Sequence, residues 1–272
     1  KLFKTKDFKQ FFDTNKEWLV PYAAFVYLRD RFKSPDFRTW GEFSIYDQVK
    51  IEKLCSPDSR AWIDIAVHYF IQYHLNKQLK EVANYARKNG IILKGDIPIG
   101  ISPNSVEAWT EPHLFNLNGQ AGAPPDDFAV KGQNWGFPTY NWDEMAKNGY
   151  QWWIKRMKKM ADYFDTYRID HILGFFRIWE VPSDAVEALL GHFNPALPLS
   201  TREIGNYGIY FNHERFAKPY IRYHILKPLF GEATDMVVET YLDGLGHNHF
   251  SLKNEFNTQQ KINRHFLNGI EE

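Results

Sequence analysis

Apolar side chains recur at helical intervals in two long stretches near the start of the chain, and each stretch predicts a helix. The first covers about residues 7–33, and we expect an interruption at Pro21 because proline removes a helical hydrogen bond. The second begins near Arg60, and Asn89-Gly90 supplies a left-handed stop after it. The N-terminal part of the chain is therefore predicted to be helical.

Two short apolar segments further along each carry an acid and predict buried strands. Residues 91–97 contain Asp96, and residues 167–172 contain Asp170. A third helix, predicted over residues 141–164, lies between them. A strand, a helix and a second strand in this order are typical of neighbouring parallel strands in an α/β sheet or barrel. In barrels of this kind, catalytic residues lie at the carboxyl ends of the strands.

The remaining segments have a different composition. Residues 98–141 form a long loop region rich in Pro, Gly, Asn and Trp, and loops of this length are usually functional. After Pro182 the pattern becomes mostly helical and loop-like, so we divide the chain into residues 1–182 and a mostly helical segment over residues 183–272. The third helix can be capped by Asn141. Its basic side chains are predicted to form a solvated face: Lys155, Arg156, Lys158 and Lys159.

The charge balance excludes several classes of partner. The chain has 272 residues, with 33 basic and 33 acidic side chains, so neither nucleic acid nor an anionic membrane surface is an expected partner. No apolar run reaches the length of a membrane span, and no signal segment is present. With Cys55 as the one cysteine and no Asn-x-Ser/Thr sequon, we expect a cytoplasmic protein. No metal site and no cofactor are predicted.

The aromatic content is high. Phe, Trp and Tyr make up 17% of the residues, and nine of them are tryptophans. Sugars present flat C–H faces that stack on aromatic rings, so this composition is typical of a carbohydrate-binding protein. A large aromatic core is the alternative, and composition alone favours it.

Asp170 is the first candidate for chemistry, because Arg168 precedes it by two positions and His171 follows it. Residues i and i+2 of a strand project to the same side, so Arg168 can hold Asp170 ionised, as a nucleophilic carboxylate requires. A same-strand ion pair without catalytic function is the alternative, and spacing alone favours it. A histidine in such a position is more often packed than catalytic.

Polar groups with an aromatic ring form a second candidate site. Asp96 ends its strand in a rigid turn, where an aspartate can also bond its own backbone. Asp126, Gln133 and Trp135 combine an acid, an amide and a ring within one loop segment. Sugar subsites are built in this way, from groups that bond hydroxyls and a ring beneath the pyranose. The alternative is a loop that is merely rigid.

Four motifs carry a resemblance to a known family. They occur in this order: Gly95-Asp96-x-Pro98-Ile99, Pro124-Pro125-Asp126-x-Phe128, Gly132-Gln133-x-Trp135-Gly136-x-Pro138-x-Tyr140 and Arg168-Ile169-Asp170-His171-x-x-Gly174-Phe175. Their order and spacing resemble the amylomaltase and disproportionating-enzyme family of 4-alpha-glucanotransferases, glycoside hydrolase family 77. The likeness runs from about Phe8 to Pro182.

The resemblance implies an α/β fold in which residues 1–182 are part of a (β/α)8 (TIM) barrel. It implies that Asp170 is the nucleophile of a retaining double displacement and that Arg168 orients and ionises it. The substrate would be a maltooligosaccharide or another alpha-glucan. The side chains implied to contact it are Asp96, Asp126, Gln133 and His171 through glucose hydroxyls, and Trp135 through the substrate groove.

The chain also departs from the family pattern. The acid/base glutamate and a further aspartate expected after the nucleophile are not present, so we expect an inactive internal fragment. Asp127 stands where an aromatic residue is common. Residues 183–272 resemble the insertion of the longer, plant-cytosolic-type enzymes, which carry starch-binding modules upstream. A retaining alpha-glucan hydrolase and a non-catalytic glucan-binding module remain alternatives.

Overall fold

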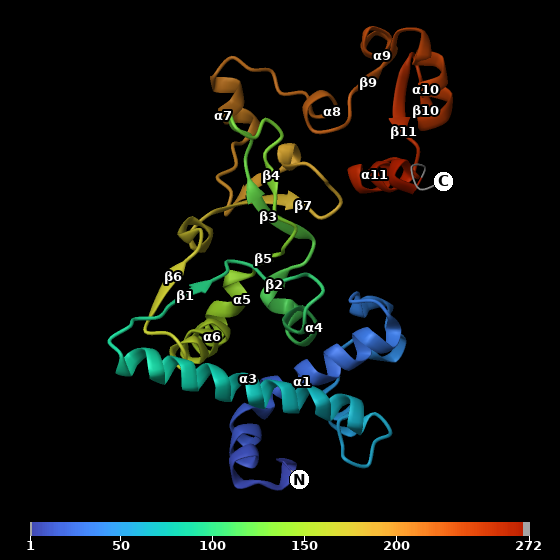
Figure 1. Ribbon diagram of the computed structural model, residues 1–272. Helices are drawn as coiled ribbons and strands as arrows, with labels where there is room; N and C mark the ends of the chain where they lie inside the picture. The colour runs from blue at the N-terminus through green and yellow to red at the C-terminus, as the bar shows by residue number, and fades with distance from the viewer. Residues whose placement is uncertain (1, 269–272) are drawn as a thin grey trace. The chain divides into compact units, whose positions relative to one another are not determined.

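The computed structural model describes residues 2–268 and shows a mixed α/β fold (Figure 1). The described chain forms two compact units. The first contains residues 2–121 and 135–176, and the second contains residues 122–134 and 177–268. The short segment 122–134 belongs to the second unit through strand pairing, although its neighbours in sequence belong to the first.

Helices α1 (Lys6–Phe32) and α3 (Trp62–Lys88) pack against each other in the first unit. Thr5 caps α1 by accepting a hydrogen bond from the Phe8 N–H at 3.3 Å. The interruption expected at Pro21 is wrong, because α1 continues through this residue. Pro21 is itself buried, and helix packing outweighs one lost hydrogen bond. The largest fully buried side chains of this core are Leu19, Leu28, Trp40, Ile51, Ile65, Tyr69 and Trp109.

The stop expected at Asn89-Gly90 is confirmed. Helix α3 ends at Lys88, and Gly90 adopts a left-handed φ of +72°. Short elements connect the two long helices: η2 (Phe37–Thr39), η3 (Gly41–Phe43) and α2 (Gln48–Leu54), with η1 (Leu2–Lys4) before α1.

Strands β1 (Lys94–Ile97) and β6 (Thr166–Ile169) pair in parallel, which confirms the expected neighbouring parallel strands. Both strands are shorter than the sequence pattern indicated. Ile91 and Ile92 are exposed and precede β1, while the chain after Ile169 leaves the strand.

The helix expected over residues 141–164 is two helices, α5 (Trp142–Lys147) and α6 (Gln151–Ala161). Asn141 caps α5 as expected, accepting from the Glu144 N–H at 3.2 Å. The prediction of one helix is wrong because Gly149 and Tyr150 both adopt positive φ, which ends α5. The core beneath these helices is a separate cluster: Ile97, Leu114, Phe115, Tyr140, Met145 and Trp153.

The loop region over residues 98–141 contains several short elements. These are α4 (Val106–Thr110), η4 (Pro112–Leu114), β2 (Phe115–Asn116), β3 (Gly119–Ala123), β4 (Gln133–Asn134) and β5 (Thr139–Tyr140). Strands β2 and β5 pair antiparallel within the first unit. The segment is therefore held by local pairing rather than being an unstructured connection.

The second unit contains two small sheets. One has the strand order β4-β3-β7-β8, with β7 (Ile178–Pro182) and β8 (His192–Asn194), and the other has the order β10-β11-β9. The remaining elements are η5 (Ile172–Phe175) in the first unit and, in the second, η6 (Ala188–Leu190), α7 (Thr201–Asn206), α8 (His213–Phe216), β9 (Ile221–Arg222), α9 (Tyr223–Phe230), η7 (Gly231–Ala233), α10 (Thr234–Tyr241), β10 (Leu242–Gly246), β11 (His249–Leu252) and α11 (Gln259–Asn268). Within residues 2–268 no sheet closes into a barrel.

Candidate active site

The centre of the candidate site is a pair of side chains on the two parallel strands. Asp96 of β1 and Arg168 of β6 are direct partners in the strand register. Arg168 donates from Nε to Oδ1 of Asp96 at 2.8 Å and from Nη2 to Oδ2, which is a two-pronged pair. Both side chains are exposed by more than half of their area. The guanidinium of Arg168 lowers the pKa of the Asp96 carboxyl below its usual range.

Asp170 lies one residue beyond the end of β6 and is exposed. Its backbone N–H donates to the Ile97 carbonyl at 3.4 Å, so it remains alongside β1. The expected direct pairing with Arg168 is not found among the described residues, since Arg168 bonds Asp96 instead. The pKa of Arg168 is raised mainly by its hydrogen bond to Asp96, with a smaller contribution from the Asp170 charge.

The backbone explains this difference. Strand β6 ends at Ile169, so the alternation that would bring Asp170 to the same side as Arg168 does not extend to Asp170, and His171 after it is left-handed, with φ 49° and ψ 58°. Arg168 and Asp96 are opposite each other on neighbouring strands, and this register brings their side chains to one side of the sheet. A left-handed conformation such as that of His171 is uncommon for a residue other than glycine and is often found at functional sites.

Trp135 and His171 lie together in the first unit. Their ring centroids are 4.8 Å apart at an interplanar angle of 81°, an edge-to-face contact. Trp135 also stacks on Phe137, with centroids 5.8 Å apart. Trp135 is half-buried and His171 is exposed. The two rings therefore form an accessible aromatic surface, and His171 directly follows Asp170 in the sequence.

Asp126 and Gln133 belong to the second unit. One carboxylate oxygen of Asp126 accepts from the N–H groups of Phe128 at 2.9 Å and Ala129 at 2.6 Å, which makes a local turn. Gln133 pairs with Ala123 in the β3–β4 ladder. Asp126 thus stabilises its own loop, as the rigid-loop alternative expects. Phe128, two residues later, is fully exposed and places an aromatic ring on the loop surface.

Sequence reasoning missed one residue near the site. Arg156 was expected on the solvated face of α6, but its guanidinium lies over the rings of Trp152 and Trp153, at 5.1 and 5.2 Å from their centroids. It also donates from Nη2 to the Pro98 carbonyl, just after β1, at 3.1 Å. The pattern Trp-Trp-x-x-Arg on one helix was the available signal, since residues i and i+3 or i+4 are neighbours on a helix.

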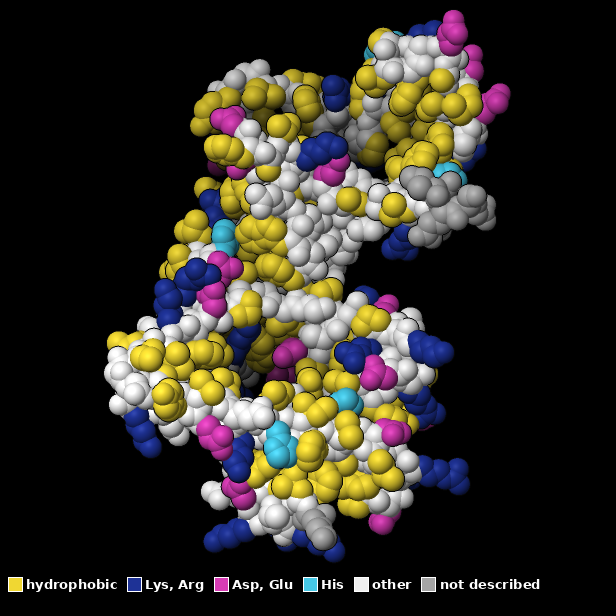
Figure 2. Space-filling view, in the orientation of Figure 1, with side chains coloured by type: hydrophobic (Ala, Val, Ile, Leu, Met, Phe, Trp, Pro, Cys, Tyr) yellow, Lys and Arg dark blue, Asp and Glu magenta, His cyan; other side chains and the backbone are white. Residues whose placement is uncertain are grey.

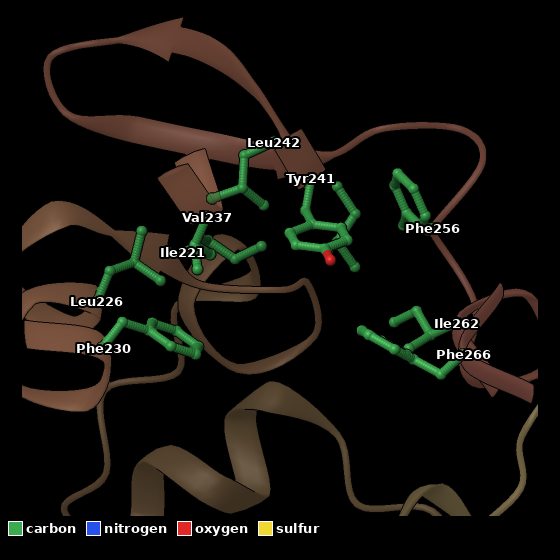
Figure 3. Close-up of a pocket in the computed structure, with 10 residues that line it drawn as sticks. Ile221, Leu226, Phe230, Val237, Tyr241, Leu242, Phe256, Ile262 and Phe266 are labelled. Atoms are coloured by element: carbon green, nitrogen blue, oxygen red, sulfur yellow. The ribbon is translucent and has the colours of Figure 1, made fainter. Parts of the chain in front are cut away.

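A separate cavity of about 290 Å³ lies in the second unit (Figure 3). Its lining is apolar apart from the hydroxyl of one tyrosine, so it lacks the acids and amides that bond sugar hydroxyls. The lining residues are Ile221, Leu226, Phe230, Val237, Tyr241, Leu242, Leu252, Phe256, Ile262 and Phe266.

Two further features limit the chemistry of the described residues. Over residues 2–268, no group of three or more His, Cys, Asp or Glu side chains could hold a metal ion. In the same part of the chain, every helix is too short or too polar to cross a membrane. Figure 2 shows basic and acidic side chains interspersed on the visible face.

The fold is similar to that of solved amylomaltases. The amylomaltase from Streptococcus agalactiae, solved in complex with acarbose, matches with a TM-score of 0.64 and 29% sequence identity, over 77% of this chain and 44% of that chain. The amylomaltase from Corynebacterium glutamicum matches with a TM-score of 0.56 and 19% identity, over 73% of this chain and 26% of that one. At that identity the second likeness concerns the fold alone.

The family model for glycoside hydrolase family 77, described as 4-alpha-glucanotransferase, matches residues 2–263. The chain therefore belongs to this family. It is 47% identical over 271 residues to the rice 4-alpha-glucanotransferase DPE2, which covers 100% of this chain. It is 34% identical over 194 residues to the 4-alpha-glucanotransferase of Streptococcus pneumoniae serotype 4, which covers 69% of this chain.

The chain spans only part of these relatives. It covers 28% of the length of the rice protein and 38% of the length of the Streptococcus pneumoniae protein.

Proposed function

We propose that this chain is the nucleophile-bearing part of a 4-alpha-glucanotransferase that transfers alpha-1,4-glucan chains between maltooligosaccharides or larger glucans. The observation that carries the proposal is the position of Asp170. It is exposed at the end of β6, next to the Asp96–Arg168 pair, in a chain that the family model matches almost throughout.

The proposed reaction is a double displacement with retention. A carboxylate oxygen of Asp170 forms a bond to the anomeric carbon of the donor, and the bond from that carbon to the leaving glucan oxygen breaks. An acid/base group protonates the leaving oxygen. The same group then takes the proton from the acceptor hydroxyl, whose oxygen bonds the anomeric carbon and releases Asp170 as a carboxylate.

This mechanism needs a second carboxyl group about 5–5.5 Å from the nucleophile. The family's acid/base motif has no counterpart in this chain, so we infer that the second group is supplied by sequence outside it. The 272 residues are accordingly expected to be inactive alone.

Substrate contacts are proposed for two sets of residues. In the first unit, Trp135 and His171 offer an aromatic surface and a ring nitrogen. Asp96 is the third member, and its two-pronged bond to Arg168 supports a role for Arg168 in fixing this acid. We propose that Arg168 also orients Asp170. In the second unit, Asp126 and Gln133 are proposed to bond glucose hydroxyls.

The architecture of the full-length protein is part of the proposal. We infer that residues 1–182 contribute to a (β/α)8 catalytic barrel and that residues 183–272 are a mostly helical insertion. The parallel pairing of β1 with β6 and the similarity to amylomaltases support the barrel. Starch-binding modules upstream and a cytoplasmic location remain predictions from the sequence.

The test is covalent trapping in the full-length protein. An alpha-glucosyl fluoride is expected to label Asp170, and maltooligosaccharides are expected to be redistributed in length. Release of reducing sugar without an acceptor would favour a hydrolase instead. Glucan binding without labelling or turnover would favour a non-catalytic binding module.

A further inference from the structure

Arg156 of α6 is packed against aromatic rings, unlike a basic side chain that extends freely into solvent. Its guanidinium lies over two indole rings, those of Trp152 and Trp153, and its side chain is only half-exposed. The terminal nitrogen Nη1 is buried and makes no hydrogen bond among the described residues. A buried nitrogen without a partner is costly, and the two ring faces and the bond to Pro98 are the contacts that offset this cost.

Two side chains hold consecutive carbonyl groups in the turn that follows β1. Arg156 donates to the Pro98 carbonyl at 3.1 Å, and the Tyr140 hydroxyl donates to the Ile99 carbonyl at 2.6 Å. Burial raises the pKa of Tyr140 to about 12, with the nearby positive charge of Arg156 acting in the opposite direction. The phenol therefore remains a protonated donor across the physiological range.

The turn held in this way connects directly to the candidate site. It begins two residues after Asp96 and ends at Gly100, where the backbone lies against the ring of Phe137. A Cβ atom at Gly100 would lie 2.1 Å from that ring. Phe137 in turn stacks on Trp135, which contacts His171.

We propose that Arg156 is a positioning residue for the glucan site: by holding the Pro98 carbonyl, it fixes the turn that carries Asp96 at one end and supports Phe137 and Trp135 at the other. The inference rests on the proposed function, because the residues that Arg156 positions are those proposed to bind glucan. Arg156 does not touch the substrate or the reacting atoms.

The consequence of losing Arg156 is a looser turn rather than an unfolded protein. The ring of Phe137 would lose its fixed backing at Gly100, and Trp135 would no longer be held at one position beside His171. Small displacements of groups that position a substrate can cost as much as about a hundredfold in rate. We expect the main effect on substrate affinity, because the displaced groups bind glucan.

The test compares variants of the full-length protein in maltotriose disproportionation and in calorimetric binding of a maltooligosaccharide. Arg156→Met keeps an unbranched apolar stem and removes both the charge and the donor. Arg156→Lys keeps the charge over the rings and one donor. Lys158→Met is the matched control, because Lys158 is an exposed basic residue of the same helix.

Arg156→Met is expected to raise KM and the glucan dissociation constant by roughly tenfold or more, with a smaller change in kcat. Arg156→Lys should recover part of this loss, and Lys158→Met should leave both constants unchanged. A purely structural role would reduce the fraction of active protein, which lowers apparent kcat and leaves KM unaltered. Native KM and native affinity in folded Arg156→Met would overturn the proposal.

A second variant keeps the test decisive if Arg156→Met does not fold. Gly100→Ala forces Phe137 to move while Arg156 is intact, so it should raise KM in the same way. Native KM in both Gly100→Ala and Arg156→Lys would then contradict the inference. A wild-type protein that binds glucan without transferring it would refute the proposed function, and the dissociation constants would still test Arg156.

Discussion

Arg168 and Asp96 face each other across two parallel strands, and the guanidinium of one bonds both carboxylate oxygens of the other. This pair joins β6, which ends one residue before Asp170, to β1, which leads into the turn at Pro98. Its geometry has a consequence that can be measured as a function of pH.

Asp96→Asn should reduce stability at neutral pH and have less effect in acid. The pKa of Asp96 is lowered from 3.8 by its hydrogen bond to Arg168, so the stabilisation is fully present above pH 3.8 and is lost as the pH falls through the depressed pKa. Urea unfolding of wild type and Asp96→Asn over a pH series measures this. Asp13→Asn, at an exposed position on α1, is the control. A difference that persists unchanged in strong acid would contradict this assignment.

Asp170→Asn in the full-length protein should abolish transfer and leave glucan binding largely intact. The exchange is nearly isosteric, but an amide is a very weak nucleophile. Losses on the order of 10⁴-fold or more in turnover are typical of nucleophile replacements. Maltotriose disproportionation and calorimetric binding are measured together, with Asp143→Asn on α5 as an exposed acidic control. Near-native turnover in Asp170→Asn would exclude it as the nucleophile.

Gly122→Ala should destabilise the strand pair that carries the Asp126 loop. The added Cβ would lie 2.0 Å from the backbone carbonyl oxygen of Gln133, which cannot move without breaking the β3–β4 ladder. We expect a loss of about 1–3 kcal/mol in unfolding free energy, as for other overpacked sites.

The control for that variant is Gly205→Ala in α7, where the added Cβ would meet no described atom within 4 Å apart from its chain neighbours and the backbone of its own helix. Alanine in a helix should there add about 0.5–1 kcal/mol. Urea unfolding followed by circular dichroism measures both changes. Equal effects of the two substitutions would show that the close contact at Gly122 has no energetic weight.

Cys55 should resist alkylation in the native protein. It is buried, and burial raises the pKa of its thiol to about 11, so little thiolate exists near pH 8. Iodoacetamide labelling followed by peptide mass analysis should show slow modification in native buffer and rapid modification after unfolding in urea. Fast labelling of the folded protein would mean that this part of the core opens readily.

Local sequence signals predicted the fold where one interaction decides the outcome. The Asn89-Gly90 stop and the Asn141 cap were both found because each acts on its own helix end. The interruption at Pro21 was wrong because a buried helix face can outweigh one missing hydrogen bond. Gly149, which ends α5, follows an asparagine as Gly90 does, but the apolar periodicity continued across it and hid the signal.

The candidate site was predicted only as far as spacing along one strand allows. Spacing along the strand indicated Asp170 as the partner of Arg168, and only the strand register shows that Arg168 bonds Asp96 instead. Arg156 was placed on a solvated face because periodicity identifies the side of a helix and says nothing about what lies over it. The two adjacent tryptophans cover this side chain through their own packing.

The strand order of the second unit constrains how the molecule can be divided. Residues 122–134 pair with strands that follow residue 176, although both flanking segments belong to the first unit. A single cleavage at residue 176 would therefore place the hairpin β3–β4 and its partner strand β7 on different pieces, and a cleavage at residue 182 would do the same to β7 and β8. Independent expression of either unit from one continuous piece of the gene is not expected to yield a folded product, and proteolytic nicking there should leave the two fragments associated.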